Sequence, residues 1–145
     1  MLITRQRIGE LIPHSGSMCL LDAATSWDDE KIRCTATSHR DPANPLRGAH
    51  GLRTICALEY AAQAMALHGA LTGNRGQRPR GGLLASARDL VLHRARLDDC
   101  GDELTIEAHR VQGEASRVIY EFRVSDASAV IAEGRAAVVL DVGLA

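Results

Sequence analysis

Aromatic residues are scarce in this chain of 145 residues, which holds one Trp, two Tyr and one Phe. Proteins that bind single-stranded nucleic acid stack the bases on aromatic side chains, so the scarcity argues against such a surface. The formal net charge is -1, whereas a nucleic-acid-binding domain normally carries a basic excess. Composition therefore gives no support for nucleic acid as a partner. Because 46% of the residues are hydrophobic, the chain is expected to fold around an aliphatic, alanine-rich core.

Long apolar runs and cysteine motifs are also missing. No run approaches the roughly 20 residues that a membrane-spanning helix needs, and residues 1–7 do not resemble a signal peptide. The four cysteines lie at irregular spacing without Cys-x-x-Cys, which indicates reduced thiols in a cytoplasmic protein. No two histidines are four residues apart, and no Gly-rich loop of a standard phosphate-binding form occurs. We therefore expect no membrane association, no metal site and no cofactor.

The order of polar and apolar residues predicts one domain over residues 1–145. Alternating or continuous apolar stretches bounded by turn residues are typical of strands. A short helix is predicted near residues 8–12, and a hairpin precedes a long helix that is followed by a four-stranded antiparallel meander. The predicted strands are residues 18–24, 32–38, 83–93, 104–111, 118–124 and 129–140.

Residues 55–71 are apolar almost all round and include six alanines. Such a helix must be buried on most of its sides. Thr54 is the predicted N-cap, and glycines at 73 and 76 end the helix. An antiparallel sheet that wraps around one apolar helix is an α+β arrangement.

Three segments occur in the order typical of one enzyme family. Residues 12–22 (Ile-Pro-His-Ser-Gly-Ser-Met-Cys-Leu-Leu-Asp) resemble the opening of the β-hydroxyacyl carrier-protein dehydratases. Residues 58–63 (Leu-Glu-Tyr-Ala-Ala-Gln) resemble the helix motif of that family, and residues 97–104 resemble its later turn. Residues 39–47 together with 59–69 are similar to the dehydratase-like proteins of aryl-polyene pigment clusters.

The resemblance implies a hotdog fold, in which an antiparallel sheet wraps around one long central helix. It implies dehydration of 3-hydroxyacyl chains carried as acyl carrier protein thioesters, in biosynthesis of the fatty-acid or polyene-pigment type. It also implies a homodimer or a heterodimer with active sites shared across the interface. Two arginine-containing loops would form a basic rim for the acidic carrier protein or its pantetheine phosphate, provided that they lie close together. These arginines, which are otherwise ordinary solvated charges, are Arg40, Arg47, Arg53, Arg75, Arg78 and Arg80.

One departure from the family concerns the catalytic histidine. The family carries His-Phe-Pro-Gly before the helix, and Pro45 stands at the position that aligns with that histidine. His39 lies before this point and His50 after it. Either residue could supply an imidazole, or neither does.

Dehydration requires a base for the α proton, an acid for the departing hydroxyl and a donor for the thioester oxygen. Glu59 is the one carboxyl inside the apolar helix, so it is the candidate acid, with burial keeping it protonated. His50 is the favoured base because it lies nearer the helix, and His39 is the alternative. Gln63, one turn after Glu59, would orient that carboxyl. The helix N-terminus would stabilise the oxygen.

Asn44 and Thr54 join Gln63 as candidates for substrate binding. The competing interpretation of Glu59 is a structural or solvated carboxylate, and that of each loop histidine is a solvated side chain. His68 is expected in a core or interface hydrogen bond, and His93 and His109 are expected to face outward.

Two other functions remain open. A hotdog thioesterase would use Glu59 as base or nucleophile and would need no histidine. A non-catalytic partner subunit would form a mixed dimer with an active dehydratase, which would account for the missing histidine motif.

Overall fold

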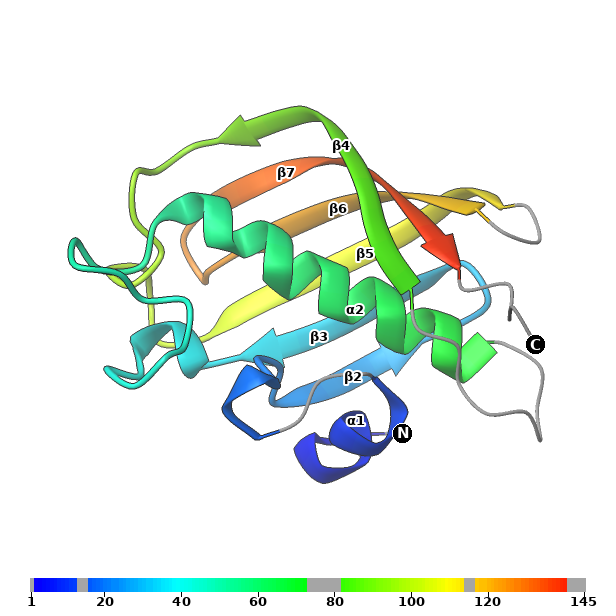
Figure 1. Ribbon diagram of the computed structural model, residues 1–145, viewed down its shortest axis with the longest axis horizontal. Coiled ribbons are helices and arrows are strands. Elements are labelled where there is room, and N and C mark those ends of the chain that lie inside the picture. Colours follow the sequence, from blue (N-terminus) through cyan, green and yellow to red (C-terminus); the bar gives the residue numbers. More distant parts are fainter. Residues whose placement is uncertain (1, 13–15, 73–81, 114–116, 141–145) are drawn as a thin grey trace.

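A computed structural model describes residues 2–12, 16–72, 82–113 and 117–140 of the chain (Figure 1). The elements, with η denoting a 3-10 helix, are β1 (Ile3–Thr4), α1 (Arg5–Leu11), η1 (Gly16–Met18), β2 (Ala23–Trp27), β3 (Lys31–Ala36), η2 (Ser38–Arg40), η3 (Thr54–Cys56), α2 (Ala57–Thr72), β4 (Gly82–Leu92), β5 (Leu104–Gly113), β6 (Arg117–Ser125) and β7 (Val130–Leu140). Within the described ranges, no helix is both long and apolar enough to cross a membrane.

The strands form one antiparallel sheet in the order β1-β2-β3-β5-β6-β7-β4. The predicted hairpin is confirmed as β2 and β3. The predicted four-stranded meander is wrong, because β4 pairs with β7 at the far edge and only β5, β6 and β7 follow one another. The physical reason is the connection over residues 93–103, which is long enough to carry the chain across the sheet, whereas neighbouring antiparallel strands need only a short turn.

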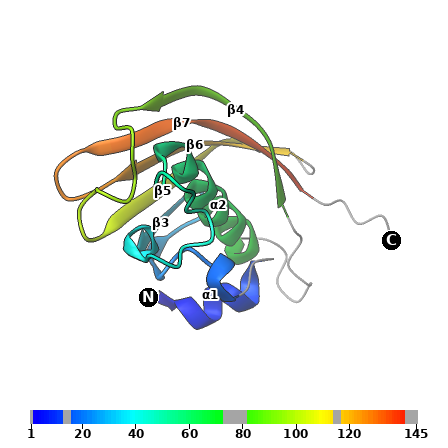
Figure 2. The same cartoon turned by 60° about the vertical axis from the view of Figure 1, so that its left-hand side comes forward.

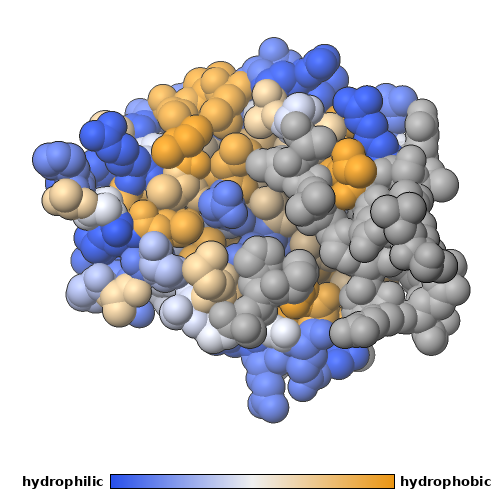
Figure 3. All heavy atoms as spheres, viewed as in Figure 1, coloured by the Kyte–Doolittle hydropathy of each residue, from blue (hydrophilic) through white to orange (hydrophobic). Residues whose placement is uncertain are grey.

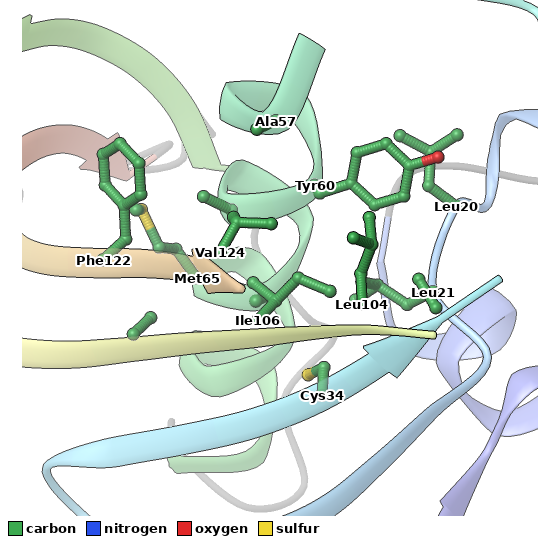
Figure 4. Packing of buried hydrophobic residues seen from close by; sticks show 14 of the residues in the cluster. Leu20, Leu21, Cys34, Ala57, Tyr60, Met65, Leu104, Ile106, Phe122 and Val124 are labelled. Carbon is green, nitrogen blue, oxygen red and sulfur yellow. The ribbon is translucent and has the colours of Figure 1, made fainter. Parts of the chain in front are cut away.

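The central helix α2 lies across the concave face of this sheet, as the hotdog fold requires (Figures 1 and 2). Alternate residues of the strands face it, and buried side chains from α2, β3, β5 and β6 point toward one another in Figure 4. On α2, Ala57, Ala61 and Ala64 are fully buried, so little side-chain bulk separates the helix from the strands. Tyr60 and Leu67 are fully buried between them and each contributes about 2 kcal/mol by leaving water.

The helix begins slightly later than predicted. Residues 54–56 form the 3-10 turn η3, and α2 starts at Ala57. The residue that precedes η3 is Arg53, whose side chain makes no capping hydrogen bond. Thr54 is therefore not the N-cap of α2. Its side-chain oxygen is buried without a hydrogen-bond partner among the described residues.

The predicted strand over residues 18–24 is only partly correct. Gly16–Met18 forms η1, and β2 begins at Ala23. Between them Leu20 and Leu21 are buried, and the backbone N–H of Leu20 donates to the side chain of Gln63 rather than to a strand. The apolar run was thus a buried connection, which periodicity alone does not separate from a short strand.

His68, which is fully buried, holds the C-terminal half of α2 in place. Its Nε2 lies 2.8 Å from the carbonyl oxygen of Asp28, and its Nδ1 lies 2.7 Å from the hydroxyl of Tyr120. A carbonyl oxygen only accepts, so Nε2 carries the proton and Nδ1 accepts from the tyrosine. The predicted core hydrogen bond of His68 is confirmed. His93 and His109 face outward, as expected, and are each about half exposed.

This buried imidazole makes stability depend on pH. Burial lowers the pKa of His68 below its ordinary value of 6.5, while the bond to Asp28 acts in the opposite direction. Just below pH 6.5 the unfolded chain therefore binds more protons than the folded chain, and the free energy of unfolding falls as the pH is lowered. The contribution of neutral His68 to the free energy of unfolding is fully present above pH 6.5.

We expect urea denaturation at stepped pH values between about 8 and 5 to show this fall in the wild type. His68→Asn, which cannot titrate, should weaken the dependence, leaving a share from His39, whose pKa burial also lowers. Tyr120→Phe keeps the imidazole and should keep the dependence. An identical dependence in His68→Asn and in the wild type would show that His68 is not its source.

Candidate active site

One side of α2 is left uncovered by the sheet. Apart from the last two residues of the helix, the exposed or half-buried residues fall on one helical face at intervals of three or four, and all of them except Glu59 are apolar or small. Together with Ile55 of the preceding turn η3, we call this the open face of α2: Ile55, Leu58, Glu59, Ala62, Ala66, Gly69 and Ala70. Figure 3 shows apolar surface near the beginning of α2 and the end of β4, where Ile55, Val91 and Leu92 are each more than 40% exposed.

Glu59 lies in the first turn of α2 and is exposed. The expectation of a buried carboxyl is therefore wrong for this chain by itself. Among the described residues its carboxylate makes no hydrogen bond or ion pair. The helix is apolar all round, but the sheet covers only the side opposite Glu59. The carboxylate thus stands as the one charged group on an apolar face that is open to solvent.

Gln63 does not touch Glu59. Its side chain is 1% exposed, with Oε1 accepting from the N–H of Leu20 at 2.9 Å and Nε2 donating to the carbonyl of Met18 at 2.6 Å. The expected orienting contact is absent, because i,i+4 neighbours share a helix face only approximately and here Gln63 falls on the buried side. Gln63 instead joins α2 to the segment before β2.

Asn44 is also engaged in structure. Its Nδ2 lies 2.8 Å from the carbonyl of Ser38 and 3.0 Å from the hydroxyl of Tyr60, and its Oδ1 accepts from the N–H of Leu46. Ser38 in turn contacts the same tyrosine hydroxyl at 2.8 Å and donates to the carbonyl of Leu20. Burial raises the pKa of Tyr60, so its hydroxyl stays protonated. This network ties the loop before α2 to the helix.

His39 and His50 occupy opposite environments. His39 in η2 is fully buried, and its Nε2 lies 2.6 Å from the carbonyl of Gly101, so Nε2 is the donor. Its Nδ1 is buried without a partner in the described ranges, and burial lowers the pKa of the ring. His50 is exposed in a tight turn, where Gly48 and Gly51 exchange both backbone hydrogen bonds.

The structure tests only half of the predicted basic rim, namely the arginines of the first loop. Arg47 donates to Asp98 at 3.0 Å, and Arg40 donates to the carbonyl of Cys100 at 3.0 Å and lies 3.9 Å from Asp102. These two arginines hold the loop before α2 against the β4–β5 loop. Arg53 is exposed and has no ion pair with another described residue. Arg75, Arg78 and Arg80 lie outside the described residues, as does His14.

The loop contacts around Asp98 were not found from the sequence. Asp98 accepts from both Arg47 and Arg96. The hydrogen bonds from Arg96 hold the pKa of Asp98 well below its usual range. In η3, burial raises the pKa of the Cys56 thiol, and the charge of Glu59 adds to the effect. In the sequence, the only local feature that pointed to the contacts of Asp98 was the Asp-rich turn at residues 98–102.

The sequence model of the ApeP-like family, described as ApeP dehydratase, matches residues 6–141. The chain belongs to this ApeP-like dehydratase family. The expected kinship with aryl-polyene dehydratases is confirmed, and with it the expectation of a dehydratase-like lyase. No curated protein sequence matches the chain significantly.

Solved structures confirm the hotdog arrangement. The dehydratase heterocomplex ApeI:P from Xenorhabdus doucetiae aligns with a TM-score of 0.76 at 21% identity, over 92% of this chain and 90% of that one. A thioesterase from Haemophilus influenzae aligns with a TM-score of 0.67 at 12% identity, over 96% and 91%. A thioesterase from Staphylococcus aureus aligns with a TM-score of 0.61 at 12% identity, over 81% and 91%. At these identities the likeness concerns the fold.

The contacts of Gln63 lead to a stability prediction. Gln63→Met should lower the free energy of unfolding by about 2–4 kcal/mol, because the N–H of Leu20 and the carbonyl of Met18 would both lose their buried partner. Urea denaturation would measure this loss in the free energy of unfolding. Gln112→Met on the exposed end of β5 is the control. A loss no larger than that of the control would contradict the fastening role.

Proposed function

We propose that this chain dehydrates 3-hydroxyacyl groups carried as acyl carrier protein thioesters, in an assembly with a second hotdog chain. The observation that carries the proposal is the membership of residues 6–141 in the ApeP-like dehydratase family together with Glu59 on the open face of α2. The carbon chain would lie along this face, whose other residues are apolar or small.

In the proposed reaction the base removes the proton from the α carbon, and the electron pair of that C–H bond becomes the new double bond. The β C–O bond breaks, and Glu59 gives its proton to the departing hydroxyl, so that water and a 2-enoyl thioester result. The thioester oxygen gains negative charge on the way, and the N-terminus of α2 would stabilise it.

Glu59 serves as an acid only if it is protonated when the substrate is bound. Burial favours the neutral form of a carboxyl, and the single chain leaves Glu59 exposed. A second chain laid over the open face of α2 would supply this burial. The edge strand β4 supports the same arrangement, because Val91 and Leu92 are exposed beside the face and an unpaired edge favours association with another strand. The ApeI:P neighbour is itself a complex of two different chains.

His50 is the base in this proposal, because its imidazole is exposed while that of His39 is fully buried with Nε2 bound to Gly101. The partner is the other source of an imidazole, and the assay below separates the two. The acidic carrier protein would approach Arg53. Among the rim arginines that the structure describes, Arg53 is the one without an ion pair.

The alternative is a thioesterase. An exposed helix carboxylate without an imidazole in contact fits a base or nucleophile for thioester hydrolysis. Its product would be a free acid and a free carrier thiol instead of an enoyl thioester.

The assay would follow the thioester of 3-hydroxybutyrate on acyl carrier protein by mass spectrometry. The full chain would be tested alone and after co-purification with a hotdog dehydratase that carries the His-Phe-Pro-Gly motif. We expect loss of water, slowed about 10²–10⁴-fold by Glu59→Gln and by His50→Ala because each removes a proton-transfer group. Glu107→Gln on the outer face of the sheet is the matched control.

An intact substrate with and without the partner would overturn the dehydratase. Release of free acid would establish the thioesterase. Dehydration only with the partner, unaffected by His50→Ala but slowed by Glu59→Gln, would assign the imidazole to the partner. Dehydration unaffected by either variant would give this chain the role of a non-catalytic helper subunit.

A further inference from the structure

The turn that carries His50 is held from both sides by the loop between β4 and β5. Ala49 and His50 form its two central residues, and the backbone hydrogen bonds between Gly48 and Gly51 measure 3.0 and 3.1 Å. After the turn, the N–H of Leu97 donates to the carbonyl of Leu52 at 2.8 Å. The turn therefore continues directly into a backbone bridge with the neighbouring loop.

Asp98 is the side chain at the centre of this contact, and it is 6% exposed. Its Oδ2 lies 3.0 Å from Nη1 of Arg47, on the N-terminal side of the turn. Its two oxygens also accept from Nε and Nη2 of Arg96, at 3.0 and 2.7 Å. The paired geometry of such an arginine–carboxylate contact restricts both partners. One buried carboxylate thus joins the start of the turn to the opposite loop.

Gly51 closes the arrangement on the C-terminal side. Its φ is +87°, a conformation that favours glycine. A Cβ at this position would lie 2.6 Å from Oδ2 of Asp98 and 2.7 Å from Nη2 of Arg96. The backbone beside His50 therefore rests directly against the ion pair, and no larger residue fits.

We propose that Asp98 is a positioning residue, which fixes the turn at residues 48–51 and thereby the place of His50. This inference rests on the proposed function in one respect only, the role of His50 as base. A base must be held close to its productive geometry, since small displacements reduce rates steeply. An exposed loop imidazole meets this requirement only if its backbone is held, and the contacts of Asp98 hold it.

The first test measures the turn itself. We expect backbone NMR order parameters of about 0.85 for residues 49–51 in the full-length wild type, and values below about 0.6 in Asp98→Asn. Asp99→Asn is the matched control, since Asp99 is the next residue, is exposed and contacts Arg94 at 3.6 Å. Gly51→Ala is the second variant, for use if Asp98→Asn does not fold, and should loosen the turn in the same way. An unchanged order in a folded variant would overturn the proposal.

The second test asks whether Asp98 acts through His50. Asp98→Asn should lower kcat by about tenfold to a hundredfold with little change in KM. In a His50→Ala background the same substitution should cause no further loss, because the group that it positions is gone. Equal losses in both backgrounds would mean that Asp98 acts by another route. If His50→Ala alone keeps the full rate, the assignment of the base fails and the NMR measurement decides the positioning role.

Discussion

The close packing of α2 on the concave sheet is the contact on which the other features depend. Ala57, Ala61 and Ala64 bring the helix close to the strands, and the hydroxyl of Tyr60 on the same helix contacts Ser38 of η2. The sheet curves around one side of the helix only (Figure 2). The opposite side therefore remains open, which is why the only carboxylate of the helix stands at the surface.

Apolar packing does not by itself fix where the helix lies along its axis, because the hydrophobic effect has no direction. Buried polar groups supply that information. Gln63 binds the backbone at residues 18–20 near one end, and His68 binds Asp28 and Tyr120 near the other. Since a buried polar group without a partner costs free energy, sliding the helix would break both sets at once. These bonds hold the open face in one place relative to the loops.

Local patterns predicted the elements well and their partners poorly. Alternation located β5 and β7 to within a few residues, because it depends on neighbours in sequence. The pairing of β4 with β7 depends on the path of residues 93–103. The length of this connection was the only sequence feature that indicated a crossing of the sheet. The sequence favours a buried Glu59 over the solvated alternative, because alanine suits both a covered and an open helix face. Likewise Asp98 pairs with Arg47, 51 residues away, and no single-sequence pattern reveals such a pair.

Pro45 stands where the β-hydroxyacyl carrier-protein dehydratases, which the chain resembles, carry their histidine, so a base supplied by this chain must come from elsewhere in the loop. The proposed base, His50, lies five residues later in an exposed turn, so its backbone needs contacts from other parts of the chain. Arg47, Gly51 and Leu52 make such contacts with the loop that carries Asp98. A fixed backbone still leaves the ring in water, and Glu59 is equally exposed. Proton transfer between positioned groups is favoured where water is excluded. In the proposed reaction, Glu59 would therefore need a second surface over the open face of α2.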